Sequence, residues 1–417
     1  MHRTAIACTT VATLGLLAAA IALGPLNPPG GAVSPSYKTL AEIEPRIAIN
    51  AANTPGDANS SFRITQPGSY YLTGNITGGV GRNGIEIAAS NVTIDLMGYT
   101  LTGNALSADG ITTDGLRDNI VIRNGTVSGW GSDGINLIAG GFGNGSTIEN
   151  ITAAGNGNAS SGYGIFANSK AVVRGCTALN NYTGIQTGSG STLSHCTASD
   201  NVLFGIKTGS ASTVSDCVAT NTTSGTGFSG GFGSVLINCS SSLNETGFFA
   251  DSGTSLSNCS AYDNSGPGFN AFSDNTISNC SALGNGTTGI GAGSGSVVEG
   301  CSASSNGGNG LSCFRDCVIR GNTLANNGSS GTGANIRVTG SANRIEANNC
   351  SGAERGIHIT AADNVIVRNT CRGATTNWEI IAGNKCLVVV AVSAGAITGN
   401  SGGAGPGSTD PNANFTY

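Results

Sequence analysis

The sequence predicts an all-β fold in which one chain winds repeatedly around a single axis as a parallel β-solenoid. Three observations carry this prediction: the composition, a recurring Gly followed by an aliphatic residue or Phe, called the Gly–aliphatic dipeptide below, and a row of cysteines with the same period. The chain has 417 residues, of which 67 are glycine, 10% are charged and 38% are hydrophobic, with a net charge of −5. The low charge excludes long surface helices, the hydrophobic content excludes disorder, and the acidic balance excludes a nucleic-acid partner.

The N-terminal residues predict an export signal. Arg3 precedes an apolar run over residues 6–23, so residues 1–24 are expected to be a signal peptide, with an uncleaved membrane anchor as the alternative. Residues 25–36 are expected to form a Pro/Gly linker. The mature chain is therefore expected to be secreted, periplasmic or on the cell surface, monomeric, and free of the membrane after cleavage.

The Gly–aliphatic dipeptide predicts the number of coils. Between residues 164 and 310 its steps are 20–22 residues long, and Asn335-Ile336 and Glu379-Ile380 fill two further slots without glycine. The glycines of the repeat are Gly84, Gly110, Gly134, Gly164, Gly184, Gly205, Gly227, Gly247, Gly268, Gly289, Gly310 and Gly356. Fourteen slots predict about fourteen coils.

The cysteine row predicts the interior and the corner of each coil. An aliphatic residue stands three positions before each cysteine, and alanine or serine two positions after it. These residues share one face only if the position before the cysteine bends the chain, and that position holds residue types that tolerate the left-handed conformation. The row is Cys176, Cys196, Cys217, Cys239, Cys259, Cys280 and Cys301. We expect these thiols to be buried and unbridged, whereas disulfides Cys313–Cys317 and Cys350–Cys371 stay open as alternatives.

A row of asparagines lies five positions after the cysteine slot, with Thr222 as its exception. Stacked asparagines can pass amide hydrogen bonds from coil to coil. The row is Asn181, Asn201, Asn244, Asn264, Asn285, Asn306 and Asn327. We expect an N-terminal cap and first coil over residues 37–83, the β-helix over 84–380, and a C-terminal cap and tail over 381–417. Residues 399–417 are expected to wrap the outside or to be mobile.

Three segments resemble secreted bacterial right-handed parallel β-helix repeat proteins with the pectate-lyase-like fold, in a subgroup without assigned activity. These are NVTIDLMGYTLTG from Asn91, ITQPGSYYLTGN from Ile64, and TDPNANFTY from Thr409. The resemblance implies a right-handed solenoid with caps at both ends. It also implies a polysaccharide or a cell-envelope component as partner, and it raises the possibility of a polysaccharide lyase or hydrolase.

An outward slot two positions before the cysteine position alternates in charge. We expect it to form cross-strand ion pairs with a structural role. Its members are Asp95, Arg123, Glu149 and Arg174 near one end, and Glu299, Arg320, Glu346 and Arg368 near the other.

The first candidate site lies in the slot before the repeat glycine. Asn83, Asp109 and Asp133 occupy it on successive coils, with Asp114 and Asp118 nearby. Asp109 and Asp133 are candidates for an acid/base pair or for calcium ligands, and Asn83 and Asp114 for ligand-binding residues. The alternative is that Asp-Gly is simply a common turn dipeptide.

The second candidate site is a C-terminal cluster expected to hold an anionic sugar. Arg355 and His358 are its candidate catalytic residues, either one as proton acceptor, and Arg337 and Arg344 are its candidate ligand-binding residues. Glu354, Asp363 and Arg372 belong to the same stretch, and a solvated surface near the cap is the alternative. Aromatic residues also suggest a sugar-stacking strip of Tyr163, Phe166, Tyr182 and Phe204, with Phe228, Phe248 and Phe269 in the interior.

These observations predict an exported β-helix that presents a rigid surface for binding a carbohydrate or a cell-envelope component. The alternative is a polysaccharide lyase or glycoside hydrolase acting on an acidic polysaccharide, with calcium as the one cofactor considered. The sequence leaves open whether the protein is an enzyme.

Overall fold

A computed structural model describes residues 44–138, 143–158, 160–329, 331–390, 396–399 and 409–416. The chain divides into two units, and every strand named below lies in the second unit, Arg46–Tyr417. The predicted signal peptide and linker lie outside the described residues. Within the described ranges, no helix combines the length and the apolar character that a membrane crossing requires.

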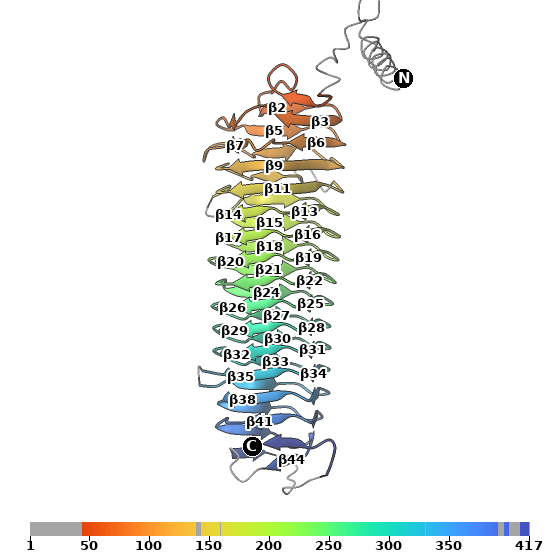
Figure 1. Ribbon diagram of the computed structural model, residues 1–417, viewed down its shortest axis with the longest axis vertical. Coiled ribbons are helices and arrows are strands. Elements are labelled where there is room, and N and C mark those ends of the chain that lie inside the picture. Colours follow the sequence, from red (N-terminus) through yellow and green to blue (C-terminus); the bar gives the residue numbers. More distant parts are fainter. Residues whose placement is uncertain are drawn as a thin grey trace, which may run out of the picture. The chain divides into compact units, whose positions relative to one another are not determined.

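The second unit is a right-handed parallel β-solenoid of about sixteen coils (Figure 1). Its described strands form two sheets, a 16-stranded sheet B and a 30-stranded sheet A. Sheet B takes one strand from each coil: β2 (Ser60–Ile64), β5 (Asn83–Ile87), β8 (Ile111–Thr113), β10 (Ile135–Asn136), β12 (Tyr163–Ala167), β15 (Thr183–Thr187), β18 (Phe204–Thr208), β21 (Thr226–Gly230), β24 (Thr246–Ala250), β27 (Phe269–Ala271), β30 (Ile290–Ala292), β33 (Leu311–Cys313), β36 (Ala334–Val338), β39 (Arg355–Ile359), β42 (Thr376–Ile380) and β45 (Ala396–Gly399).

Sheet A has two columns of strands joined at a corner. The first column is β1 (Ile47–Ile49), β3 (Gly68–Leu72), β6 (Val92–Asp95), β9 (Ile120–Ser128), β11 (Thr147–Ala154), β13 (Val172–Arg174), β16 (Thr192–Ser194), β19 (Thr213–Ser215), β22 (Val235–Ile237), β25 (Ser255–Ser257), β28 (Thr276–Ser278), β31 (Val297–Glu299), β34 (Val318–Arg320), β37 (Arg344–Glu346), β40 (Val365–Val367) and β43 (Lys385–Cys386). The second column shares β9 and β11 and adds β4 (Ile76–Thr77), β7 (Thr100–Thr102), β14 (Thr177–Leu179), β17 (Thr197–Ser199), β20 (Val218–Thr220), β23 (Ser240–Ser242), β26 (Ser260–Tyr262), β29 (Ser281–Leu283), β32 (Ser302–Ser304), β35 (Thr323–Asn327), β38 (Asn349–Ala353), β41 (Thr370–Arg372), β46 (Asn414–Thr416) and β44 (Val388–Val390).

The single-residue corner is confirmed. Each residue before a cysteine of the row has a positive φ, from 52° at Asn279 to 62° at Gly300. The complete set is Gly175, His195, Asp216, Asn238, Asn258, Asn279 and Gly300. His195 is therefore a corner residue, and the corner lets the aliphatic, cysteine and alanine positions share the interior.

The interior rows are also confirmed. The seven cysteines of the row are buried, and every cysteine in the described part of the chain is a free thiol. The alternatives Cys313–Cys317 and Cys350–Cys371 are therefore wrong as disulfides in this structure. Cys350 and Cys371 pair in register on parallel strands, so their side chains leave the backbone in the same direction.

The asparagine row forms the predicted hydrogen-bonded ladder. The Asn264 Oδ1 atom accepts the backbone N–H of Asn244 at 3.0 Å and its Nδ2 at 3.2 Å, and Asn264 donates in turn to Asn285 Oδ1 at 2.9 Å. Thr222 interrupts this pattern, since its hydroxyl is buried without a partner among the described residues.

The ladder explains the repeated glycine. A Cβ atom at Gly247 would lie 2.4 Å from the carbonyl oxygen of Gly268 and 2.9 Å from Asn264 Nδ2. Adjacent coils and the asparagine amides leave no room for a side chain there, so the glycine reflects close approach rather than an unusual φ.

Two details of the repeat differ from the prediction. The structure has about sixteen coils rather than fourteen, because β2 and β45 extend sheet B without a Gly–aliphatic dipeptide. The slot assigned to Glu379-Ile380 is wrong by two residues: Trp378 pairs with Ile357, so the slot holds Asn377-Trp378. The slot at Asn335-Ile336 is confirmed by the pairing of Ile336 with Leu311.

The end of the tail belongs to the solenoid. Strand β46 pairs with β41 on one side and β44 on the other, so it does not wrap the outside as expected. Asn414 accepts hydrogen bonds from both the backbone N–H and Nδ2 of Asn369, each at 2.9 Å. The C-terminal strand therefore continues a buried asparagine ladder.

Candidate functional site

In the strands of sheet B from β2 to β42, one position of each strand faces outward between two buried or partly buried neighbours. Strand pairing aligns these side chains from coil to coil as one continuous row, which we call the outer row. Its members are Arg63, Glu86, Thr112, Asn136, Phe166, Gln186, Lys207, Ser229, Phe249, Asn270, Gly291, Ser312, Arg337, His358 and Glu379. Charged and aromatic residues of the outer row and its borders are the candidates for ligand contact.

The structure brings Asn83, Asp109 and Asp133 together as a ladder at the border of sheet B. Asn83 Oδ1 accepts the N–H of Asp109 at 3.0 Å, and Asp109 Oδ1 accepts the N–H of Asp133 at 3.1 Å. Asp133 accepts the N–H of Tyr163 at 2.8 Å and Nδ2 of Asn136 at 2.7 Å. Both oxygens of Asp133 thus have donors from the protein.

Asp133 is the carboxyl with the most unusual environment. It is only 6% exposed. Burial and the nearby charge of Asp109 raise the pKa of Asp133 to about 6. A carboxyl with this pKa is suited to proton transfer, but its enclosed position and its two hydrogen bonds equally fit a structural role.

Replacing Asp109 with asparagine is expected to stabilise the protein at pH 7 by up to about 1 kcal/mol. Because the pKa of Asp133 is raised on folding, its ionisation costs stability as pH rises through the range from about 4 to 6. Asp109→Asn removes the repulsion while keeping an oxygen for the N–H of Asp133, as Asn83 does one coil earlier. Denaturant unfolding at pH 7 and near pH 3.5 measures the effect, which disappears at the lower pH.

Asp200→Asn is the control, because it changes the net charge equally on a different coil. An equal gain from Asp109→Asn at both pH values would contradict repulsion between the two carboxylates as the cause.

The hydrogen-bond donors around Asp109 and Asp133 do not favour the binding of a cation by these carboxylates. Three oxygens of the pair already accept N–H groups. Within the residues that the structure describes, no group of three or more His, Cys, Asp or Glu side chains could hold a metal ion. No calcium-dependent step is assigned here, and calcium binding by Asp109 and Asp133 stays a prediction.

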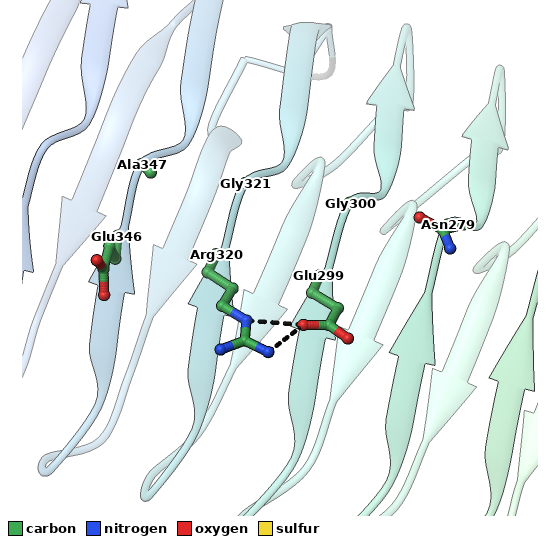
Figure 2. Close-up of a pocket in the computed structure, with 7 residues that line it drawn as sticks. All are labelled: Asn279, Glu299, Gly300, Arg320, Gly321, Glu346 and Ala347. Atoms are coloured by element: carbon green, nitrogen blue, oxygen red, sulfur yellow. Dashed lines mark hydrogen bonds and ion pairs between the residues drawn. The ribbon is translucent and has the colours of Figure 1, made fainter.

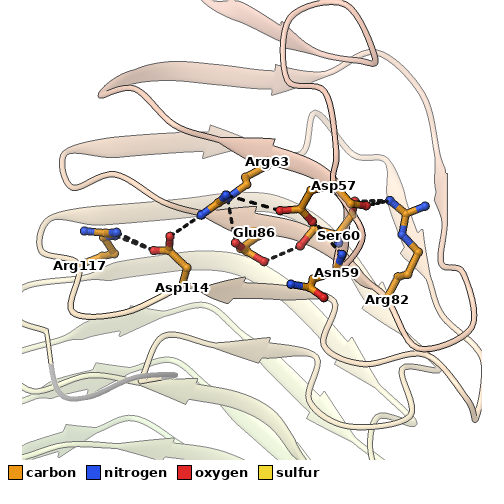
Figure 3. Close-up of polar contacts among 8 residues, drawn as sticks. All are labelled: Asp57, Asn59, Ser60, Arg63, Arg82, Glu86, Asp114 and Arg117. Atoms are coloured by element: carbon orange, nitrogen blue, oxygen red, sulfur yellow. Dashed lines mark hydrogen bonds and ion pairs between the residues drawn. The ribbon is translucent and has the colours of Figure 1, made fainter.

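Asp114 lies apart from the aspartate pair, at the other end of β8, in a network of ion pairs (Figure 3). Its carboxylate contacts Arg63 and Arg117, each at 2.7 Å, and Arg63 also contacts Glu86 at 2.9 Å. Although burial alone raises the pKa of Asp114, hydrogen bonds from Arg117 and Arg63 bring it below its usual value. The network joins the first coils of sheet B and engages Asp114 within the protein.

The C-terminal candidates converge in part. Arg337, His358 and Glu379 are consecutive members of the outer row, on β36, β39 and β42. Arg355 Nε lies 2.5 Å from Glu379 Oε2, and His358 Nε2 lies 3.7 Å from Glu379 Oε1. We call Arg337, Glu354, Arg355, His358 and Glu379 the Arg–His cluster. Glu379 is a member that sequence reasoning missed.

Several buried polar atoms of the Arg–His cluster have no hydrogen-bond partner among the described residues. They are Nε of Arg337, Nδ1 of His358 and Oε2 of Glu354. No ion pair of Arg337 occurs within the described part of the chain, whereas Arg355 is paired with Glu354 and Glu379. Burial lowers the pKa of His358, and Arg355 and Arg337 lower it further, against the opposite effect of Glu379. The lowered pKa of His358 favours the neutral imidazole.

Three residues predicted for this cluster lie elsewhere. Arg344 is on β37 of sheet A and pairs with Glu346, Arg372 is on β41 of sheet A, and Asp363 has a positive φ in the turn before β40. Arg344 was predicted to bind ligand next to Arg337, and the structure does not bring the two together. The turn between β36 and β37 carries the chain from one sheet to the other.

The predicted ion pairs form on sheet A at some steps of the alternating row but not at all of them, since the described residues show none between Arg320 and Glu346. Figure 2 shows one of the pairs, Arg320 with Glu299. Arg123 Nε lies 3.0 Å from Asp95, Arg174 lies 2.6 Å from Glu149, and Arg320 lies 2.5 Å from Glu299. Arg368 is one position out of register, because Val367 pairs with Glu346, yet Arg368 still contacts Glu346.

The corner beside the ladder is hollow. A cavity of about 450 Å³ follows the corner residues Gly300, Gly321 and Ala347. Glu299 and Arg320 pair with each other along it, and Glu346 pairs with Arg344 and Arg368. Small corner residues account for this hollow, and no function is assigned to it.

A second hollow lies on sheet B over β18, β21 and β24. It has a cavity volume of about 460 Å³, and its walls include Phe204, Lys207, Phe232, Phe249 and Asp251. Of these, the sequence suggested only Phe204, as part of an aromatic strip. The signal for Phe249 is the pair Phe248-Phe249, because strand alternation places one ring inside and the other outside.

The other aromatic predictions have mixed outcomes. Phe228, Phe248 and Phe269 stack in the interior as expected, with ring centroids 5.0 and 4.8 Å apart. Tyr163 and Phe166 contact each other at 4.3 Å, but Phe166 is buried and offers little surface to a ligand.

Together, the sheets and rows define a parallel β-solenoid that displays polar and aromatic side chains on the outer face of sheet B. The chain belongs to the right-handed β-helix family, whose model, described as right handed beta helix region, matches residues 60–223, 206–316 and 229–375. No curated protein matches the sequence.

Solved structures with a similar fold come from several sources. The A-module of mannuronan C-5 epimerase AlgE6 from Azotobacter vinelandii is 14% identical, with a TM-score of 0.44, over 84% of this chain and 90% of that chain. The tailspike protein of E. coli bacteriophage HK620, in complex with pentasaccharide, is 11% identical, with a TM-score of 0.45, over 90% of this chain and 78% of that chain. The Dettilon tailspike protein is 15% identical, with a TM-score of 0.33, over 80% and 61%.

Proposed function

We propose that the protein is exported and binds a carboxylated polysaccharide through the outer face of sheet B. The observation that carries this proposal is Arg337. Its side chain is half-buried on a rigid strand and, in the described part of the chain, forms no ion pair. An arginine held in this way has lost part of its hydration, and a carboxylate of a ligand restores its charge-assisted hydrogen bonds.

The neighbours of Arg337 support the same ligand chemistry. His358 is the next member of the outer row, and its Nδ1 atom is buried without a partner among the described residues. Glu379 is already engaged by Arg355, so the carboxylate closest to His358 is partly neutralised. A glycan running along the outer row meets these side chains from consecutive strands spaced about 4.8 Å apart.

Arg337→Gln is expected to weaken binding of polygalacturonate at least about tenfold, because it removes one charge-assisted hydrogen bond to a carboxylate. Titration calorimetry at pH 7 with soluble oligogalacturonate measures the effect. The matched control is Arg344→Gln, which removes an arginine from sheet A and is expected to leave binding unchanged. Equal affinities of wild type and Arg337→Gln would contradict the proposal, and so would an equal loss in both variants.

Lyase activity is the second candidate function, and the position of His358 next to Arg337 on the outer row, with its Nδ1 atom unpartnered among the described residues, favours it. A neutral imidazole beside a bound carboxylate can accept the proton from the carbon next to that carboxylate, after which the glycosidic oxygen leaves and a C=C bond forms. Measuring the unsaturated uronate formed in the same oligogalacturonate mixtures, with and without calcium, distinguishes catalysis from binding. Loss of this product in His358→Gln with binding retained supports the second candidate.

A further inference from the structure

The hollow on sheet B between residues 204 and 251, which we call the phenylalanine pocket, is the strongest feature that the proposed function does not use. Its cavity volume of about 460 Å³ lies within the range of small-molecule sites. It is lined by Phe204, Lys207, Ser229, Phe232, Phe249 and Asp251, among others. Three coils of sheet B lie between it and the strands of the Arg–His cluster.

The pocket arises from the order of residues in the outer row. Lys207, Ser229 and Phe249 are consecutive members, so a small side chain stands between two large ones. Gly230 and Gly231 follow Ser229 and add no bulk at the end of the same strand. The floor of the pocket therefore consists of backbone atoms and the Ser229 hydroxyl, and aromatic rings form its sides.

Contacts within the protein hold two of these rings. The Lys207 ammonium lies 4.6 Å from the centroid of the Phe204 ring. Phe249 meets Phe272 edge to face, with centroids 5.1 Å apart and an interplanar angle of 78°. Phe232, on the turn after β21, is 57% exposed. Phe204 and Phe249 are half-buried. Phenylalanines that keep part of their surface exposed around one hollow are typical of a binding site, because that apolar surface stays in water until a ligand covers it.

The charges of the phenylalanine pocket sum to zero. Lys207 supplies one cation and Asp251 one carboxylate, and no ion pair of either residue occurs within the described part of the chain. One oxygen of Asp251 accepts the N–H of Ser252 at 3.1 Å. An ammonium donor and a carboxylate acceptor on one pocket suit a ligand whose groups both donate and accept hydrogen bonds, as sugar hydroxyls do.

We infer that the phenylalanine pocket binds one ring of a neutral hexose glycan. The apolar C–H face of the sugar stacks on Phe249 and Phe232, while its hydroxyls contact Lys207, Asp251 and Ser229. This inference goes beyond the proposed function, because it concerns a ligand without carboxylates and a site separate from the Arg–His cluster.

The test is titration of the full chain with neutral oligosaccharides of glucose, mannose and galactose, each separately. We expect at least one of the three to bind, and Phe249→Ala to weaken that binding about tenfold or more, since stacking on the ring is lost. Tyr262→Ala is the matched control, because Tyr262 is 46% exposed on β26 of sheet A. Circular dichroism and thermal melting verify that each variant is folded, and Lys207→Met is a second variant that leaves all the rings in place.

Arg337→Gln separates this inference from the proposed function. It is expected to leave neutral-glycan binding unchanged, while Phe249→Ala is expected to leave oligogalacturonate binding unchanged. No binding of any of the three neutral glycans at millimolar concentration would overturn the inference. Unchanged binding in both Phe249→Ala and Lys207→Met would do the same, as would a dimer by light scattering that Phe232→Ala dissociates.

Discussion

Replacing Phe248 with alanine is expected to lower the free energy of unfolding by about 3–5 kcal/mol. Its ring is fully buried and stacks between Phe228 and Phe269, with interplanar angles of 7° and 5°. Truncation leaves a cavity between two rings fixed by their own strands, and parallel strands in register cannot shift to fill it. Urea unfolding followed by circular dichroism measures the loss.

Phe248→Ile is the matched control for this cavity. Isoleucine occupies the same interior row at Ile206 and Ile290, so a branched aliphatic side chain fits the backbone there. We expect it to lose much less stability than Phe248→Ala. A loss below about 1 kcal/mol for the alanine variant would contradict the close packing described for this row.

Replacing Asn264 with alanine is expected to cost about 2–4 kcal/mol, because it leaves buried polar groups without partners. Asn244 loses the acceptor for both its backbone N–H and its Nδ2, and the carbonyl of Ser241 loses the donor at 3.3 Å. None of these groups reaches water in the folded coil. Thermal melting and urea unfolding measure the change.

Thr222→Asn is the opposite change in the same ladder, and we expect it to stabilise the protein by about 1 kcal/mol. Thr222 stands between Asn201 and Asn244, and Gly205 beside it lacks a side chain like the other glycines of the repeat. An asparagine there continues the amide chain across the interruption. If Asn264→Ala and Thr222→Asn changed stability in the same direction, the ladder would not be the source of the effect.

The period, the corner and the buried rows were predictable because each is local and repeats. Cys239 and its corner residue Asn238 repeat the pattern of the other coils in the cysteine row. An error in assigning one coil therefore does not shift the assignment of the next. Strand β46 was not predictable in this way, since Asn414 pairs with Asn369 at a sequence separation of 45, about twice the period of the repeat. The coil of Trp378 was misassigned because Asn377 stands where the repeat has glycine, and Trp378 stands where it has an aliphatic residue or phenylalanine.

The candidate sites were less predictable from the sequence than the fold was. Arg337 and His358 were found by their charge, but Glu379 was assigned to a slot two residues away from its true register. Arg344 is near Arg337 in sequence, yet a turn places it on the other sheet. Phe232 lies in the turn after β21, where the repeat gives no register, so its approach to Phe249 on the next coil depends on three-dimensional structure.

Because the coils stack at a constant spacing, the distance between two points on the outer row depends on the number of coils between them. Four register steps separate Phe249 from Arg337 along the outer row, which is about 19 Å at the usual distance between neighbouring strands. Insertion or loss of a complete coil changes that length by one fixed increment and leaves both contact points intact. A polymer that contacts both Phe249 and Arg337 must therefore carry groups at a matching spacing. Gain or loss of a coil during evolution changes the spacing that is required.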